Sequence, residues 1–168
     1  RTRPNKFLIS TLRQMGKDIR GQGSQETVPI LLKEGFLKGG RVRIDGSLSS
    51  QFISALLIAS PLLDDDTRLQ IAGRKIVSLP YIKMTLCVLK KAGIRILKRS
   101  DSLYVIKGRQ KFQGLGRFTV PSDDGLSAFL LAAGALLPSR LVLKGFFDGA
   151  LDQADGRIFD FLKKMGAR

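Results

Sequence analysis

The chain has 168 residues and a formal net charge of +15, from 29 Lys and Arg against 14 Asp and Glu. Its hydrophobic content of 43% is enough to build a core, so the composition excludes a wholly disordered chain. The chain has no histidine, which excludes histidine-based catalysis. Its single cysteine, Cys87, excludes an internal disulfide framework and cysteine zinc sites. The positive charge predicts anionic ligands but does not say which kind.

Three amphipathic helices with similar endings are predicted along the chain. Apolar residues at i, i+4 and i+7 precede Gly16, Gly93 and Gly166. Each glycine suits the left-handed position that follows a helix, and basic residues in the last turn complement the helix dipole. The long and similar intervals between the glycines indicate a repeated subdomain rather than a solenoid.

Two further helices are apolar almost all round, and we expect them to be buried on every side. They span 50–60 and 126–137, and Pro61 and Pro138 end them at equivalent places. Short runs of strand character separate the helices, most of them alternating apolar with polar residues. These runs are 41–44, 68–71, 94–97, 103–106, 117–120 and 140–143.

From Gly40 to Gly108 the predicted order is strand, buried helix, strand, amphipathic helix, strand, strand. The same order restarts at Gly116, after a glycine-rich stretch that is the best candidate boundary. We therefore predict an α/β (α+β) fold of repeated βαβαββ subdomains. Residues 1–115 would form one lobe, with the end of one copy and a complete copy, and 116–168 the start of a second lobe.

The longest apolar stretch, 52–63, contains Ser54, Ser60 and Pro61 and is shorter than the ~20 residues of a membrane span. No signal peptide is recognisable at the start. We expect a soluble, cytoplasmic protein without membrane contact. Because Arg1 is not a natural start, we also expect the chain to be part of a longer one.

Three serines and a glutamine stand where the first apolar helix begins, in Asp45-Gly-Ser-Leu-Ser-Ser-Gln51. Backbone N–H groups and the positive end of the helix dipole at such a place bind phosphate or carboxylate well. The alternative is ordinary capping by one serine, and the residues by themselves favour capping.

A matching junction precedes the second amphipathic helix, in Val77-Ser-Leu-Pro-Tyr-Ile82. Ser78 is placed to cap, Pro80 suits the first turn, and Tyr81 offers an amphipathic ring. If both helix starts converge, they could share one ligand. Arg3, before Pro4, could hold a carboxylate or phosphate with two parallel hydrogen bonds.

Other polar or glycine-rich segments are predicted to have structural roles. Residues 21–24 and 114–116 read as turns, because neither has the pattern of a nucleotide-binding loop. The aspartates 64–66 are predicted to form a solvated loop rather than a calcium site, because the segment lacks the residue spacing of a calcium-binding loop. Asp123 and Asp124 read as a helix cap, and a general base is the alternative.

Taken in order, Asp45-Gly-Ser-Leu-Ser-Ser-Gln-Phe52, Val77-Ser-Leu-Pro-Tyr-Ile82 and Val120-Pro-Ser-Asp123 resemble landmarks of the 5-enolpyruvylshikimate-3-phosphate synthase family. The Arg3-Pro4 start and the Leu-Lys-Lys-Met-Gly166 end fit the same family. The resemblance therefore covers the whole chain, which would correspond to the middle of the family's length.

The resemblance implies a two-lobed fold of βαβαββ subdomains. It also implies transfer of the enolpyruvyl group of phosphoenolpyruvate to the 5-hydroxyl of shikimate 3-phosphate, with no metal or organic cofactor. By resemblance, Ser49, Ser50, Gln51, Ser78 and Tyr81 would bind shikimate 3-phosphate. Arg3 and Gln51 would bind phosphoenolpyruvate, in a monomer.

The chain departs from the family at Ser122-Asp-Asp-Gly-Leu126, where the family has Gly-Asp and a pair of small residues. The family's amino-terminal Lys-Ser element, carboxy-terminal basic residues and proton-transferring acid have no counterpart in this stretch. We therefore expect the catalytic groups in the rest of the protein's own chain, and no turnover by these residues alone.

Three rival functions fit the sequence less well than the resemblance does. A UDP-N-acetylglucosamine enolpyruvyl transferase shares the fold but not the Ser49-Ser50-Gln51 element. An RNA 3′-phosphate cyclase would need a histidine. A non-catalytic basic nucleic-acid-binding module would explain the charge, but aromatics are 7% of the chain, tryptophan is absent, and we expect no nucleic-acid binding.

Overall fold

The computed structural model describes residues 4–33, 35–145, 151 and 153–167. The chain divides into two compact units, 1–114 and 115–168, and each is described by itself. In the first unit the elements are α1 (Lys6–Gln14), β1 (Ile19–Gln22), β2 (Thr27–Leu32), β3 (Gly40–Asp45), α2 (Ser50–Ala59), η1 (Ser60–Leu62), β4 (Thr67–Ala72), α3 (Leu79–Lys91), β5 (Ile96–Ser100) and β6 (Leu103–Ile106). In the second they are α4 (Asp124–Leu136), η2 (Ala154–Arg157) and α5 (Ile158–Lys164).

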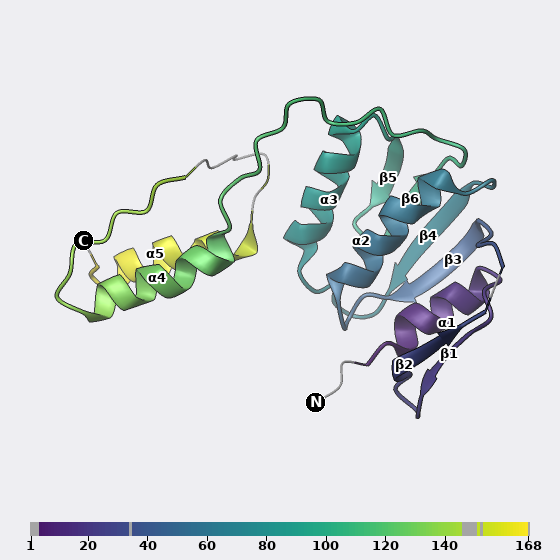
Figure 1. The fold of residues 1–168 in the computed structure, drawn as a ribbon, viewed down its shortest axis with the longest axis horizontal. Coiled ribbons are helices and arrows are strands. Elements are labelled where there is room, and N and C mark those ends of the chain that lie inside the picture. Colours follow the sequence, from purple (N-terminus) through teal and green to yellow (C-terminus); the bar gives the residue numbers. More distant parts are fainter. Residues whose placement is uncertain (1–3, 34, 146–150, 152, 168) are drawn as a thin grey trace. The chain divides into compact units, whose positions relative to one another are not determined.

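A four-stranded sheet in the order β3-β4-β6-β5 organises the first unit. β3 and β4 are parallel, with α2 between them in sequence, and the other two pairs are antiparallel. Figure 1 shows α2 and α3 together over one face of this sheet. The predicted α/β class and the βαβαββ order between Gly40 and Gly108 are confirmed.

The core lies between the sheet and these two helices. Ile53 and Leu57 of α2 pack in one buried cluster with Leu69 of β4 and Tyr104 of β6, and none of the four is exposed. Burial raises the pKa of Tyr104 to about 12, and its hydroxyl donates to the Asp101 carbonyl at 3.1 Å. The hydroxyl of the buried Tyr104 side chain thereby has a hydrogen-bond partner within the core.

The opposite face of the sheet is polar, as the alternation predicts. In β3, Val42 and Ile44 are buried while Arg41 and Arg43 are exposed. β4 repeats this pattern, since its burial alternates residue by residue. Because successive side chains of a strand point to opposite faces, the arginines lie on the side away from α2.

The three predicted helix endings are also confirmed. Gly16, Gly93 and Gly166 have φ of 87°, 86° and 93°, values that suit glycine because it has no Cβ. After α3, Ile94 donates its backbone N–H to the Leu89 carbonyl at 2.9 Å, which closes the end of the helix. The predicted strand 94–97 consequently begins two residues later, at Ile96.

Three expectations about elements were wrong, and one hairpin was missed. Gly21 and Gln22 lie in β1, which forms an antiparallel hairpin with β2 that the pattern did not predict, so only the rest of 21–24 is a turn. Residues 117–120 and 140–143 are not strands. A strand needs a hydrogen-bonded neighbour, and the described residues of the second unit supply none.

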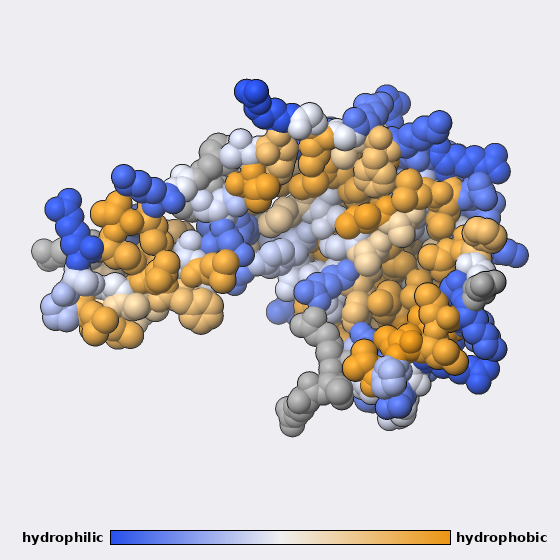
Figure 2. Space-filling model, in the orientation of Figure 1, coloured by the Kyte–Doolittle hydropathy of each residue, from blue (hydrophilic) through white to orange (hydrophobic). Residues whose placement is uncertain are grey.

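The helices predicted to be buried on every side are not. Along α2, Gln51, Ala55 and Ile58 are exposed. No residue of α4 is buried, and Phe129 is 78% exposed. Apolar side chains gather on the surface of the second unit in Figure 2. An apolar helix is buried only by what packs on it, and among the described elements α4 packs mainly against η2 and α5.

Across the described residues, no helix has the length and apolar character that crossing a membrane requires.

Candidate functional site

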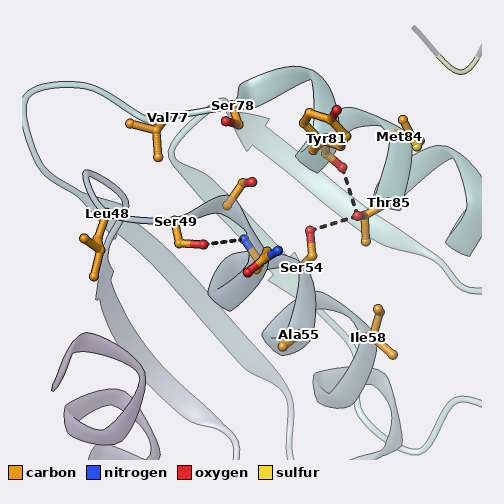
Figure 3. A pocket seen from close by; sticks show the side chains of 12 residues that line it. Leu48, Ser49, Ser54, Ala55, Ile58, Val77, Ser78, Tyr81, Met84 and Thr85 are labelled. Carbon is orange, nitrogen blue, oxygen red and sulfur yellow. Dashed lines mark hydrogen bonds between the residues drawn. The ribbon is translucent and has the colours of Figure 1, made fainter. Parts of the chain in front are cut away.

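A pocket of about 650 Å³ opens where α2 and α3 begin (Figure 3). Its walls come from the loop before α2, the first turns of both helices and the segment before α3. The described residues that line it are Leu48, Ser49, Ser50, Gln51, Ser54, Ala55, Ile58, Val77, Ser78, Tyr81, Met84 and Thr85. The five residues predicted to bind one substrate therefore meet at one pocket, although two segments far apart in sequence supply them.

Backbone hydrogen bonds bring the two junctions together. β3 and β4 are parallel neighbours, so their carboxyl ends lie at the same edge of the sheet. Gly46 donates to the Ala72 carbonyl at 2.9 Å, and Val77 donates to the Gly46 carbonyl at 3.1 Å. A Cβ on Gly46 would lie 2.5 Å from Ile71 Cγ2, so this close approach requires glycine.

Asp45 shapes the loop that leads from β3 into the pocket. Its Oδ1 accepts the backbone N–H of Ser47 at 2.8 Å. Hydrogen bonds from the Ser47 side chain and backbone, together with the nearby charges of Arg43 and Lys6, hold the pKa of Asp45 below its ordinary value. The carboxylate is therefore ionised at neutral pH and organises the loop.

Ser49 caps α2, as the capping interpretation predicts. Its backbone is extended, with φ −161° and ψ 128°, and its Oγ accepts the N–H of Gln51 at 3.2 Å. One serine thus provides the cap. Ser50 is the first residue of α2 and is buried, while Gln51 is exposed at the mouth of the pocket.

Ser78 occupies the predicted cap position of α3, but its hydroxyl makes no capping hydrogen bond. Its backbone is left-handed, with φ 52° and ψ 44°, a conformation that is costly for a residue with a Cβ. The Tyr81 N–H donates instead to the Ser78 carbonyl at 3.0 Å. The Ser78 side chain lines the pocket and does not cap the helix (Figure 3).

Two hydroxyls that sequence reasoning missed connect the helices across the pocket wall. Ser54 Oγ lies 2.9 Å from Thr85 Oγ1, which donates to the Tyr81 carbonyl at 2.9 Å. Both residues belong to largely apolar stretches and stand four residues after a predicted site residue, Ser50 or Tyr81. A search for hydroxyls one helical turn after the site residues would have found them.

None of the described residues that line the pocket carries a charge. Polar recognition there rests on hydroxyls, the Gln51 amide and backbone groups. The predicted Arg3 lies outside the described residues. Among the described ranges, no three His, Cys, Asp or Glu side chains are grouped as a metal ion would require.

In the second unit, Asp123 is the cap of α4, as predicted. Its Oδ1 accepts the Leu126 N–H at 3.0 Å, and its carbonyl accepts the Ser127 hydroxyl at 2.8 Å. The Asp123 carboxylate therefore caps the start of α4. The alternative role of Asp123 and Asp124 as a general base stays untested.

Comparison with known proteins finds one family over the whole chain. The sequence model of the EPSP synthase (3-phosphoshikimate 1-carboxyvinyltransferase) family matches residues 1–168. The 3-phosphoshikimate 1-carboxyvinyltransferase of Methanosarcina acetivorans is 41% identical over 99% of this chain and 38% of its own length. That of Salmonella heidelberg is 38% identical over 98% of this chain and 38% of its own.

Solved structures give the same result for the fold. A 2.37 Å structure of EPSP synthase from Acinetobacter baumannii matches with a TM-score of 0.55 and 25% identity, over 80% of this chain and 28% of that one. The chain thus spans well under half the length of the relatives it matches. Because the family match runs through every residue, and relatives from an archaeon and a bacterium agree with it, the chain belongs to the EPSP synthase family.

Proposed function

We propose that the protein containing this chain transfers the enolpyruvyl group of phosphoenolpyruvate to the 5-hydroxyl of shikimate 3-phosphate, and that the pocket at the starts of α2 and α3 binds shikimate 3-phosphate. The observation that carries the proposal is the meeting of Ser49, Ser50, Gln51, Ser78 and Tyr81 at one pocket. Its volume of about 650 Å³ falls within the ~300–1,000 Å³ of small-molecule sites.

The proposed pose follows from the chemistry of the pocket walls. A phosphate would lie at the serines, where two helix starts direct their positive dipole ends and hydroxyls donate. The ring would lie against Tyr81 and the apolar wall that includes Ile58 and Met84. The exposed amide of Gln51 is placed to reach a second ligand as well. The basic chain would attract both anionic substrates.

Arg3 is proposed to bind phosphoenolpyruvate together with Gln51. Its guanidinium suits a carboxylate or phosphate, which it can contact with two parallel hydrogen bonds. The acid and base that move protons are proposed to lie in other parts of the protein. The proposal needs no cofactor or metal, and it describes a cytoplasmic monomer with residues 1–115 and 116–168 in separate lobes.

Calorimetric titration with shikimate 3-phosphate tests the binding site. The double variant Ser49→Ala, Ser50→Ala should lose at least about 100-fold in affinity, because two hydrogen bonds are removed and each hydrogen bond to a charged group contributes roughly 1.5–3 kcal/mol. The matched control is Ser100→Ala, Ser102→Ala, another pair of serines, whose hydroxyls lie 3.1 Å apart at the β5–β6 turn. Equal affinities of the two double variants would refute the site assignment.

A second measurement tests where the catalytic groups lie. The 168-residue chain, supplied with shikimate 3-phosphate and phosphoenolpyruvate, should release no phosphate above background. Product formed by this chain alone would show that its own residues suffice for turnover, contrary to the proposal.

A further inference from the structure

The hydroxyls of Ser54 and Thr85 form a short chain in the wall of the pocket. Ser54 lies on α2 and Thr85 on α3, and both line the pocket. Ser54 Oγ is 2.9 Å from Thr85 Oγ1, which is 2.9 Å from the Tyr81 carbonyl oxygen. Figure 3 shows these two contacts as a continuous path from α2 to the backbone of α3.

The direction of this chain follows from counting protons. A hydroxyl has one proton to donate and two lone pairs to accept with. A carbonyl oxygen can only accept, so the Thr85 proton goes to Tyr81. Thr85 Oγ1 must then accept from Ser54, since the opposite assignment would place lone pairs of Thr85 and Tyr81 against each other at 2.9 Å.

The Ser54 proton is therefore committed to Thr85, and the Ser54 oxygen can offer the pocket only its lone pairs. The pocket consequently has two chemically different parts. The helix starts around Ser49 and Ser78 offer donors, whereas Ser54 offers an acceptor. A phosphate at neutral pH presents mainly acceptor oxygens, so it is unsuited to Ser54, while a ligand hydroxyl is well suited to it.

We infer that Ser54 is a specificity-determining residue that accepts a hydrogen bond from a ring hydroxyl of the ligand, and that Thr85 is a positioning residue that fixes the direction of the Ser54 hydroxyl. This rests on the proposed function, because shikimate 3-phosphate carries ring hydroxyls besides its phosphate. The helix starts hold the phosphate, and Ser54 selects the hydroxylated ring.

The test is a set of titrations of the intact protein that carries this chain. The ligands are shikimate 3-phosphate and its analogues in which the 4- or the 5-hydroxyl is replaced by hydrogen. Ser54→Ala should weaken binding of shikimate 3-phosphate five- to tenfold. The analogue that lacks the hydroxyl bound by Ser54 should bind wild type five- to tenfold more weakly than shikimate 3-phosphate does. The same analogue should bind Ser54→Ala no more weakly than it binds wild type.

Thr85 is tested by two substitutions. Thr85→Val removes the acceptor of the Ser54 proton, so the preference for the hydroxylated ligand over that deoxy analogue should fall at least threefold. Thr85→Ser keeps the hydroxyl and should retain the wild-type preference. A purely structural role would change affinity for all ligands alike and leave this ratio unchanged. Ser102→Ala, at the β5–β6 turn, is the control, and thermal unfolding verifies that each variant is folded.

The outcomes separate the two proposals. If Ser54→Ala binds shikimate 3-phosphate as wild type does, or if neither deoxy analogue couples to Ser54, this inference is overturned while the proposed function stands. If the intact protein does not bind shikimate 3-phosphate at all, the proposed function fails and the inference fails with it.

Discussion

Ser78 offers the sharpest test of the pocket, because its backbone and its side chain can be probed separately. The residue is left-handed, with φ 52° and ψ 44°, and its hydroxyl does not cap α3. Ser78→Ala removes the hydroxyl but keeps a Cβ in the left-handed conformation. Ser78→Gly removes both the hydroxyl and the Cβ. The two variants therefore differ only in backbone strain and chain entropy.

The magnitude follows from two opposing contributions. The left-handed conformation costs a residue with a Cβ roughly 1–2 kcal/mol relative to glycine. Glycine loses more backbone entropy on folding than alanine, which offsets about 0.5–1 kcal/mol. The glycine variant should therefore be more stable than the alanine variant by about 0.5–1 kcal/mol. In a helix interior the order is the reverse, with glycine ~1 kcal/mol less stable.

Thermal unfolding followed by circular dichroism, with titration of shikimate 3-phosphate, measures both effects. The glycine variant should melt about 2–6 °C above the alanine variant. The two variants should lose the same affinity, about tenfold relative to wild type, because both lack the hydroxyl. An alanine variant as stable as the glycine variant would refute the reasoning about strain. Unchanged affinity in both would remove Ser78 from the site.

Other predictions concern the loop before α2. Ser49→Ala should lower the free energy of unfolding by about 1 kcal/mol through loss of the cap, whereas Ser49→Asp should keep the cap and lose anion affinity, as urea unfolding and titration would show. The lowered folded-state pKa of Asp45 means that its stabilisation is complete above the unfolded pKa of about 4 and is lost as pH falls through the folded value. The difference in free energy of unfolding between wild type and Asp45→Asn should therefore disappear in acid. Asp65→Asn, at an exposed position in another loop, is the control. A difference that persists in acid would contradict the role assigned to Asp45. Gly46→Ala should cost about 1–3 kcal/mol, because its Cβ would lie 2.5 Å from Ile71 Cγ2, and an unchanged melting temperature would argue against this contact.

The sequence predicted the fold correctly where a structural feature depends on one short segment of the chain. The endings at Gly16 and Gly93 depend on residues within one turn, so the positions of the glycines predict them. Strand alternation in β3 and β4 is likewise local. The hairpin β1–β2 was missed, since its pairing joins Ile19 to Leu32 across a turn without a recognised hairpin signal.

Burial could not be predicted in the same way. The compositions of α2 and α4 are similarly apolar, yet α2 buries residues against a sheet and α4 buries none among the described residues. Apolar composition predicts a tendency to be buried, but the neighbouring elements decide whether burial occurs.

For the candidate site, too, some features follow from the sequence and others only from the tertiary structure. The sequence by itself determined the family, the order of elements between Gly40 and Gly108 and the identities of Ser49, Ser50, Gln51, Ser78 and Tyr81 as candidates, because these depend on residues close together in the chain. Only the tertiary structure decided that they line one pocket, that Ser49 caps while Ser78 does not, and that the hydroxyls of Ser54 and Thr85 meet in the pocket wall. These features arise where parallel strands bring distant segments together and hydrogen bonds form between them, and local sequence patterns do not report such contacts.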